Sequence, residues 1–201
     1  MEPLVETVTF THQFLWRVGK LNLESAQAEP AHRKYFLTSS FLVSFLAFEA
    51  FIHYLGEIVR PEIWAQERQY FRKPPYQGLD GKFRFLSESL SVVLLPDDPD
   101  YIKFLRAKHC RDLIAHGKPM RLEFPYDPED SIIAKGDYMK LAWDEIFVES
   151  EIENIRHSLQ ILAERLRAPS YEKHSEDELH LIFPAFNGCV ATASNHFGLI
   201  K

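Results

Sequence analysis

Apolar residues recur along this chain every three to four positions, the spacing that places side chains on one face of an α-helix. Pro30, Pro61 and the Lys-Pro-Pro-Tyr-Gln-Gly run at residues 73–78 interrupt the pattern, because proline disfavours helix in the residue before it. The pattern predicts helices over residues 5–27, 32–59, 61–71, 82–93, 101–116 and 143–167. We therefore expect an all-α bundle of about five main helices.

The pattern is less regular in two regions outside these helices. Residues 119–141 contain three prolines and are expected to be irregular, with a short hairpin as one form. Residues 170–180 are polar and predict a linker, and residues 181–200 form an apolar tail that either docks on the bundle or swaps onto a partner. The predicted organisation is one bundle domain over residues 1–168, followed by an irregular extension over residues 169–201.

The predicted helix at residues 32–59 is apolar nearly all round in its middle, so it must be covered on most sides. It is either the central helix of a bundle or a helix that partly faces another subunit. Glu49, His53 and Glu57 would be costly in a membrane, and the N-terminus lacks the basic start of a signal peptide. We expect a buried helix in a cytoplasmic protein that has no membrane partner. Four phenylalanines on this helix are predicted to belong to the core: Phe41, Phe45, Phe48 and Phe51.

The charge of the chain is uneven. Its 201 residues carry a net charge of −6, which argues against general affinity for nucleic acid. Residues 101–121 carry six Lys and Arg against one Asp, a local charge of +5, together with two histidines. Such a patch on an acidic protein suits selective binding of a polyanion, although a solvated helix face has the same composition. Cys110 and Cys189 match no metal-binding spacing and are expected to be reduced and buried.

The helix at residues 101–116 can be laid out at 100° per residue. This layout predicts that His109, Asp112 and His116 share one flank, with the Asp112 carboxylate orienting the His116 imidazole four residues later. Arg111 lies about 140° away from His116, so the two converge poorly within one chain. An antiparallel second copy across a two-fold axis would supply the missing group, which predicts a composite site in a homodimer. The face turned to the bundle is predicted to hold Ile102, Leu105, Cys110, Leu113 and Ile114.

The segment from Arg111 to Gly117 has the form Arg-x-x-x-x-His, with a polar residue after the arginine and glycine after the histidine. This pattern resembles the signature of the HEPN superfamily. The apolar helix around residues 44–52, the late position of the motif and the final amphipathic helix are also similar, and together they cover roughly residues 5–168. The resemblance implies a HEPN-like helical bundle that forms a homodimer and acts as a metal-independent endoribonuclease in a toxin–antitoxin, antiviral or RNA-processing setting.

The resemblance also implies roles for residues. Arg111, Asp112 and His116 would be catalytic: His116 moves the proton of the ribose 2′-hydroxyl, Arg111 binds the phosphate and Asp112 orients the imidazole. The products would be a 2′,3′-cyclic phosphate and a free 5′-hydroxyl. No cofactor is expected, and RNA and a cognate antitoxin or regulatory protein are the expected partners. Apart from the resemblance, Glu49 is expected to be either a buried acid hydrogen-bonded to a neighbouring helix or a supporting acid that reaches the motif helix. The candidate RNA-binding residues are Lys103, Arg106, Lys108, His109, Lys118 and Arg121.

Other interpretations of the same residues stay open. His116 next to a helix-ending glycine is also typical of a residue that only satisfies terminal carbonyls, and Arg111 is also typical of a salt-bridge residue. Glu49, His53 and Glu57 resemble half of a metal–carboxylate site, but no Glu-x-x-His pair completes it, so no metal ligand is predicted. The competing function is a non-catalytic HEPN-like interaction module that binds nucleic acid, nucleotide or a partner protein.

Overall fold

The computed structural model describes residues 10–116, 146–174 and 184–186, and this part of the chain contains no β-strand. The predicted all-α fold is therefore confirmed. The helices are α1 (Thr11–Ala28), a 3-10 turn η1 (Pro30–His32), α2 (Arg33–Val59), α3 (Pro61–Trp64), α4 (Glu67–Tyr70), α5 (Gly78–Ser89), α6 (Pro99–Ala115) and α8 (Glu149–His174).

Helix α2 is the centre of the bundle. It packs against α1, α3, α5, α6 and α8. Its four predicted core residues Phe41, Phe45, Phe48 and Phe51 are all at most 1% exposed, which confirms that stripe as core. The Pro30–Val59 segment is long and apolar enough to cross a membrane by length and composition alone, and half of its apolar window is buried inside the protein, as in the core helix of a bundle.

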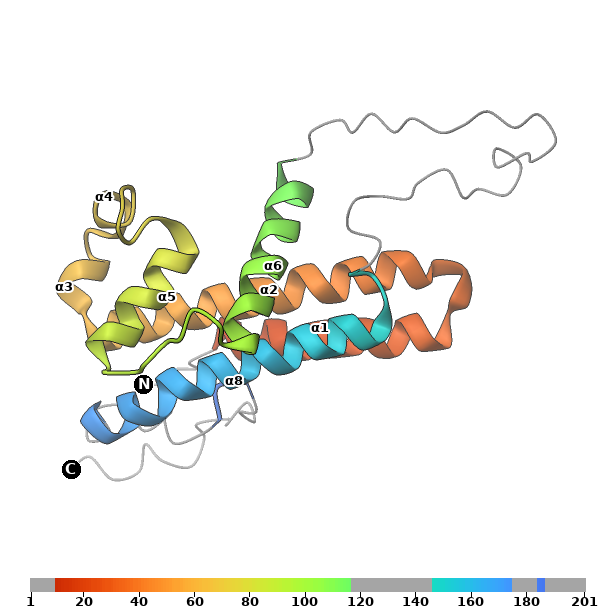
Figure 1. The fold of residues 1–201 in the computed structure, drawn as a ribbon. Helices are drawn as coiled ribbons and strands as arrows, with labels where there is room; N and C mark the ends of the chain where they lie inside the picture. The colour runs from red at the N-terminus through yellow and green to blue at the C-terminus, as the bar shows by residue number, and fades with distance from the viewer. Residues whose placement is uncertain (1–9, 117–145, 175–183, 187–201) are drawn as a thin grey trace, which may run out of the picture.

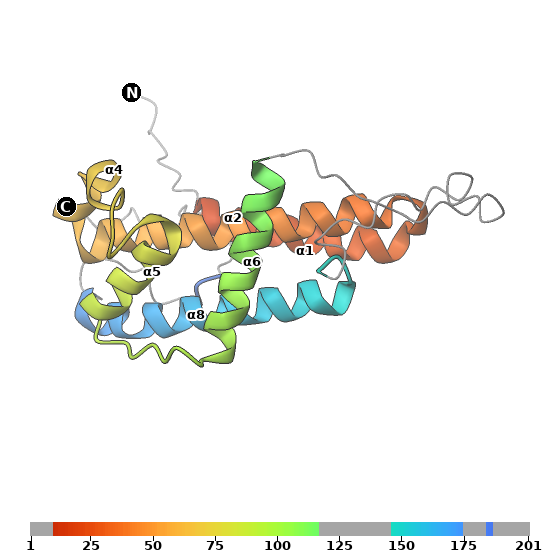
Figure 2. The ribbon, with the colours of Figure 1, turned by 45° about the horizontal axis from the view of Figure 1, so that its top comes forward.

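Figure 1 shows α1, α2 and α8 lying lengthwise, with α6 crossing them at a steep angle. Helices α4 and α5 lie at one end of α2, and the C-terminal end of α6 projects beyond the bundle. The turned view in Figure 2 shows the same arrangement. In both views α4 and the last turns of α6 rise on the same side of α2, away from α8.

A buried cation joins the three long helices. The guanidinium of Arg156, in α8, lies 4.0 Å from the Trp16 ring centroid of α1 and donates hydrogen bonds to the Trp16 carbonyl and to Ser44 Oγ of α2. Burial lowers the pKa of Arg156 to about 10. A Cβ on Gly19 would lie 2.4 Å from Ser44 Oγ of α2 and 2.6 Å from Arg156 Nη1. Glycine at this position therefore leaves room for the contact between Arg156 and Ser44.

Two predicted boundaries are wrong near α5. The helix predicted at residues 61–71 is two short helices, α3 and α4. The helix predicted at 82–93 begins and ends four residues earlier, at Gly78–Ser89. Gly81 permits the early start, because a Cβ there would lie 1.9 Å from the Tyr76 carbonyl carbon. Ser91, at φ 60°, ends the helix, and the Val92 N–H reaches back 2.8 Å to the Ser87 carbonyl, a Schellman-type end.

The predicted helix at 143–167 and the predicted linker from residue 170 are also displaced. Residues 146–148 are not helical, and α8 continues through Pro169 to His174. The Ser170 hydroxyl donates 2.7 Å to the Leu166 carbonyl, and Ser170 is fully buried, so packing overrides the proline break. In the predicted apolar tail, Phe186 stacks on Trp16 at 4.0 Å and is 4% exposed, so this part docks on its own bundle. The irregular region predicted at 119–141 and Cys189 lie outside the described residues.

Candidate functional site

The start of α6 is anchored to α8. Asp98 caps the helix by accepting hydrogen bonds from the backbone N–H of Asp100 at 2.9 Å and of Tyr101 at 3.2 Å. The Arg165 guanidinium of α8 contacts the carboxylates of both Asp98 and Asp100. Burial raises the pKa of Asp98, but the hydrogen bonds from Arg165 and the two backbone N–H groups outweigh it and hold that pKa below its ordinary value. The anchored start sets the direction in which α6 projects.

The buried face of α6 differs from the prediction. Phe104 packs on the rings of Phe45, Phe48 and Phe83 with centroid distances of 5.3–6.0 Å. This aromatic contact sets the rotation of the helix, because it buries more apolar area than the smaller side chains beside it. The buried residues are Tyr101, Phe104, Ala107 and Cys110, while Ile102, Leu105 and Leu113 are 50%, 38% and 38% exposed. Cys110 is buried as predicted, and burial raises its pKa to about 11.

Arg111 links α6 to α2. Its Nη2 lies 3.4 Å from Glu49 Oε2 and its Nη1 lies 3.0 Å from Asp112 Oδ1. The guanidinium carbon lies 5.2 Å from the Phe45 ring centroid, and Nε is buried with no hydrogen-bond partner among the described residues. The side chain is 21% exposed. Glu49 therefore reaches the motif helix, as the sequence indicated, and Arg111 is held in one orientation.

Asp112 and His116 are not paired as the helical spacing predicted. The Asp112 carboxylate contacts Lys108 Nζ at 2.9 Å and Arg111 Nη1 at 3.0 Å. Two cations attract a carboxylate more strongly than an imidazole does, which explains its orientation. His116 is the exposed C-cap residue of α6, with its backbone N–H 3.0 Å from the Asp112 carbonyl. Within one chain, the side chains of Arg111 and His116 are therefore separate features of the helix end.

The other predicted RNA-binding residues on α6 differ in their surroundings. Arg106 pairs with Glu151 of α8 at 3.4 Å, and Lys108 is engaged with Asp112. Lys103 is half-buried and His109 is exposed. Lys118 and Arg121 lie outside the described residues. Neighbouring acids thus balance a large part of the positive charge of this helix.

The acidic face of α2 is divided between two neighbours. Glu49 contacts Arg111, whereas His53 Nδ1 lies 3.3 Å from Glu67 Oε2 of α4. Lys82 Nζ of α5 closes the second cluster, 2.5 Å from Glu67 Oε1 and 3.0 Å from His53 Nε2. In the described ranges, no three His, Cys, Asp or Glu side chains lie together as a metal site. The cluster instead fixes α4 and α5 to α2.

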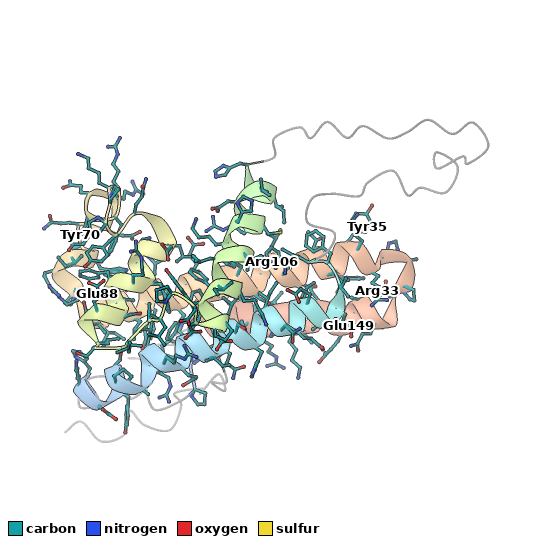
Figure 3. All side chains as sticks on the ribbon, viewed as in Figure 1. Arg33, Tyr35, Tyr70, Glu88, Arg106 and Glu149 are labelled. Carbon is teal, nitrogen blue, oxygen red and sulfur yellow. The ribbon has the colours of Figure 1, made fainter. Side chains whose placement is uncertain are left out.

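A second basic surface was not predicted from the sequence. It begins directly after Glu67, the first residue of α4. Tyr70, one of its residues, is labelled in Figure 3 at the end of the bundle where Glu88 of α5 also lies. The sequence holds a signal, because residues 68–76 intersperse cations with aromatic rings, but the helical pattern predicts only a helix end and a loop there. We call this surface the α4 loop patch, defined by Arg68, Tyr70, Arg72, Lys73 and Tyr76.

Comparison of the chain with family models, curated proteins and solved structures finds no match. The resemblance to HEPN domains therefore depends on the Arg111–His116 spacing and its helical setting.

Proposed function

We propose that this protein is a metal-independent endoribonuclease with a HEPN-like bundle, and that Arg111 and His116 form its site at a homodimer interface. One observation carries the proposal. The Arg111 guanidinium is fixed over Phe45 between two carboxylates, on a helix that projects from the bundle and ends at exposed His116. A guanidinium fixed before the reaction costs little reorganisation when negative charge develops on a phosphate.

Arg111 remains able to bind a phosphate despite its partners. Its contact with Glu49 is 3.4 Å long, beyond the ~2.7–2.9 Å of a strong charge-assisted hydrogen bond. A phosphate oxygen can therefore compete for Nη2. The planar guanidinium suits this role because it donates two parallel hydrogen bonds to a phosphate.

His116 is the proposed proton-transfer group, since imidazole changes charge near neutral pH. It takes the proton of the ribose 2′-hydroxyl as the 2′-oxygen bonds to phosphorus. The bond from phosphorus to the 5′-oxygen then breaks, and that oxygen takes up a proton. The products are a 2′,3′-cyclic phosphate and a free 5′-hydroxyl, so the reaction needs neither oxidant nor cofactor.

The dimer is proposed on the exposed face of α6. Ile102, Leu105 and Leu113 lie there with large exposed fractions. A second α6 packed antiparallel would cover them and place His116, which lies on the same face, at the interface, whereas Arg111 faces α2 of its own chain. We extend the proposal to a cytoplasmic toxin–antitoxin or antiviral role with an antitoxin or regulatory protein as partner; this part rests on the HEPN resemblance.

A second candidate function is a non-catalytic interaction module that binds nucleic acid, nucleotide or a partner protein. This alternative is favoured because both terminal nitrogens of Arg111 already contact carboxylates. In this interpretation Arg111 ties α6 to α2, and His116 only ends the helix.

The test is incubation of the full chain with mixed single-stranded RNA in EDTA. We expect cleavage to 2′,3′-cyclic phosphate ends, and its loss in both Arg111→Ala and His116→Ala. His157→Ala is the matched control, because His157 is an exposed histidine on α8. Cleavage by His116→Ala at the wild-type rate would show that the ribonuclease proposal is wrong and would leave the interaction module.

A further inference from the structure

We infer that the α4 loop patch is a binding surface for single-stranded RNA, separate from Arg111 and His116. The choice of RNA rests on the proposed function. The capacity of the surface to hold phosphates and bases does not depend on catalysis, because none of its residues belongs to the proposed reaction.

The α4 loop patch carries unpaired positive charge. Residues 68–77 contain two Arg, one Lys and no acid, a charge of +3 on a protein of net −6. Arg68, Arg72 and Lys73 are exposed, and none forms an ion pair within the described ranges. Three exposed cations on one short segment suit the phosphates of a nucleic-acid strand, where binding releases counterions.

A pair of aromatic rings lies among these cations. Tyr70 is 40% exposed, and its ring lies 6.3 Å from that of Tyr76, with only 11° between the two planes. The edge of Tyr70 also packs on Phe85, at 5.3 Å. Exposed rings beside cations are the usual platform for unstacked bases of a single strand. An acidic peptide would use the cations but would gain little from the rings, so the combination favours RNA.

The patch is attached to the core of the bundle by residues on both sides of its cations. Glu67, the first residue of α4, is held by Lys82 at 2.5 Å and by His53 at 3.3 Å. Phe71 is 5% exposed and packs on Trp64 at 5.0 Å, so the segment between the cations is fixed in the core. The Tyr76 hydroxyl donates to Glu88, which holds the second ring. Binding therefore needs little ordering of the backbone.

The patch lies near the proposed cleavage site along α2. On α2, His53 contacts the base of the patch and Glu49 contacts Arg111. These two residues are four apart on the same face, which is about 6 Å along a helix. Figures 1 and 2 both show α4 and the end of α6 on the same side of α2. One strand bound at the patch can therefore extend to the proposed cleavage site.

The test measures binding of a fluorescent oligouridine of about twelve nucleotides. The protein is the full chain carrying His116→Ala, so that the RNA stays intact, and the readout is fluorescence anisotropy at several salt concentrations. The patch variant combines Arg68→Ser, Arg72→Ser and Lys73→Ser. We expect binding about tenfold weaker. The slope of log affinity against log salt concentration should be shallower by about two. Tyr70→Leu should weaken binding about fivefold, whereas Tyr70→Phe keeps the ring and should bind like its parent.

The matched control removes the same charge elsewhere, with Arg17→Ser, Lys20→Ser and Lys173→Ser on α1 and α8. These residues are exposed, and we expect a change within about twofold. Circular dichroism confirms that each variant is folded. Equal losses in the two triple variants, or no loss in the patch variant, would overturn the inference. Polyglutamate is a second competitor. If it displaces the labelled RNA from the patch as strongly as unlabelled RNA does, the inference is overturned in favour of an acidic protein partner.

This test separates the two proposals. Wild-type protein that cleaves no RNA, together with weaker binding by the patch variant, would refute the ribonuclease proposal and support this inference. Wild-type cleavage combined with unchanged binding by the patch variant would refute only the inference.

Discussion

The two basic regions of the molecule use the same residue types but differ in what surrounds them. On α6, Arg106, Lys108 and Arg111 face the carboxylates of Glu151, Asp112 and Glu49. In the α4 loop patch, the three cations have no acid partner in the described ranges. Helix α6 therefore lies in the region with the higher formal charge in the sequence, but neighbouring acids balance its charge more fully than that of the α4 loop patch.

This difference separates two kinds of cation. A paired, half-buried arginine is held in one geometry and suits stabilisation of a single phosphate during a reaction. An exposed, unpaired arginine or lysine is mobile and suits attraction of a strand at several phosphates. Local charge counted along a sequence cannot distinguish them, because the neutralising acids of α6 come partly from α2 and α8.

The largest expected difference in stability is between Arg111 and Arg72. Arg111→Ala removes a cation over the Phe45 ring and leaves Glu49 unpaired, so the free energy of unfolding should fall by about 2 kcal/mol. Arg72→Ala should change it by less than about 0.5 kcal/mol, because the side chain is exposed. Urea unfolding followed by circular dichroism measures both. Equal effects would contradict the division into fixed and mobile cations.

A smaller effect is expected at the anchored start of α6. The pKa of Asp98 lies below its ordinary value of 3.8. The ionised carboxylate therefore contributes fully to stability above pH 3.8, and this contribution is lost as pH falls through the lowered pKa. Asp98→Asn should cost about 1 kcal/mol at neutral pH through loss of the Arg165 pair. The cost should shrink as pH falls through this lowered pKa, because the Asp98 carboxylate then takes up a proton and becomes neutral, as asparagine is.

Urea unfolding at a series of pH values measures this effect. Asp97→Asn is the control, because Asp97 is an exposed neighbour on the same loop. A cost for Asp98→Asn that stays constant down to acidic pH would mean that the carboxylate charge does not contribute.

The smallest effect should come from freeing a paired cation. Glu49→Gln removes the negative charge that faces Arg111 Nη2. The positive charge of α6 should then be less fully balanced, as it is in the α4 loop patch. We expect binding of oligouridine to tighten by about two- to fourfold. Glu57→Gln is the control, since Glu57 is an exposed acid two turns along α2 from Glu49. Equal tightening in both variants would show a general charge effect rather than release of Arg111.

The sequence predicted the parts of the fold that depend on local patterns. The bounds of α2 and α6 follow from prolines and helical spacing, and the contact of Glu49 with the motif helix follows from its place on α2. Features that depend on tertiary packing were predicted wrongly. The rotation of α6 is set by Phe104 in a ring cluster, and Pro169 stays within α8 because Ser170 is buried.

The same limit applies to the candidate site. The Arg111–His116 spacing is visible in the sequence, but the partners of Asp112 are not, since they depend on which side chains the fold brings within reach. The α4 loop patch required the fold as well. Its cations stand out only after the neighbouring acid, Glu67, is found engaged with Lys82 and His53.

The measurement that most directly tests the account is single-turnover cleavage of single-stranded RNA in EDTA, with the rate recorded against protein concentration. For Arg111→Lys, which keeps the charge and loses the fork, we predict a maximal rate about a hundredfold lower with little change in the half-saturating concentration. For the triple patch variant we predict an unchanged maximal rate and a half-saturating concentration about tenfold higher. The account is contradicted if both variants change the same parameter, or if the wild-type protein leaves the RNA intact.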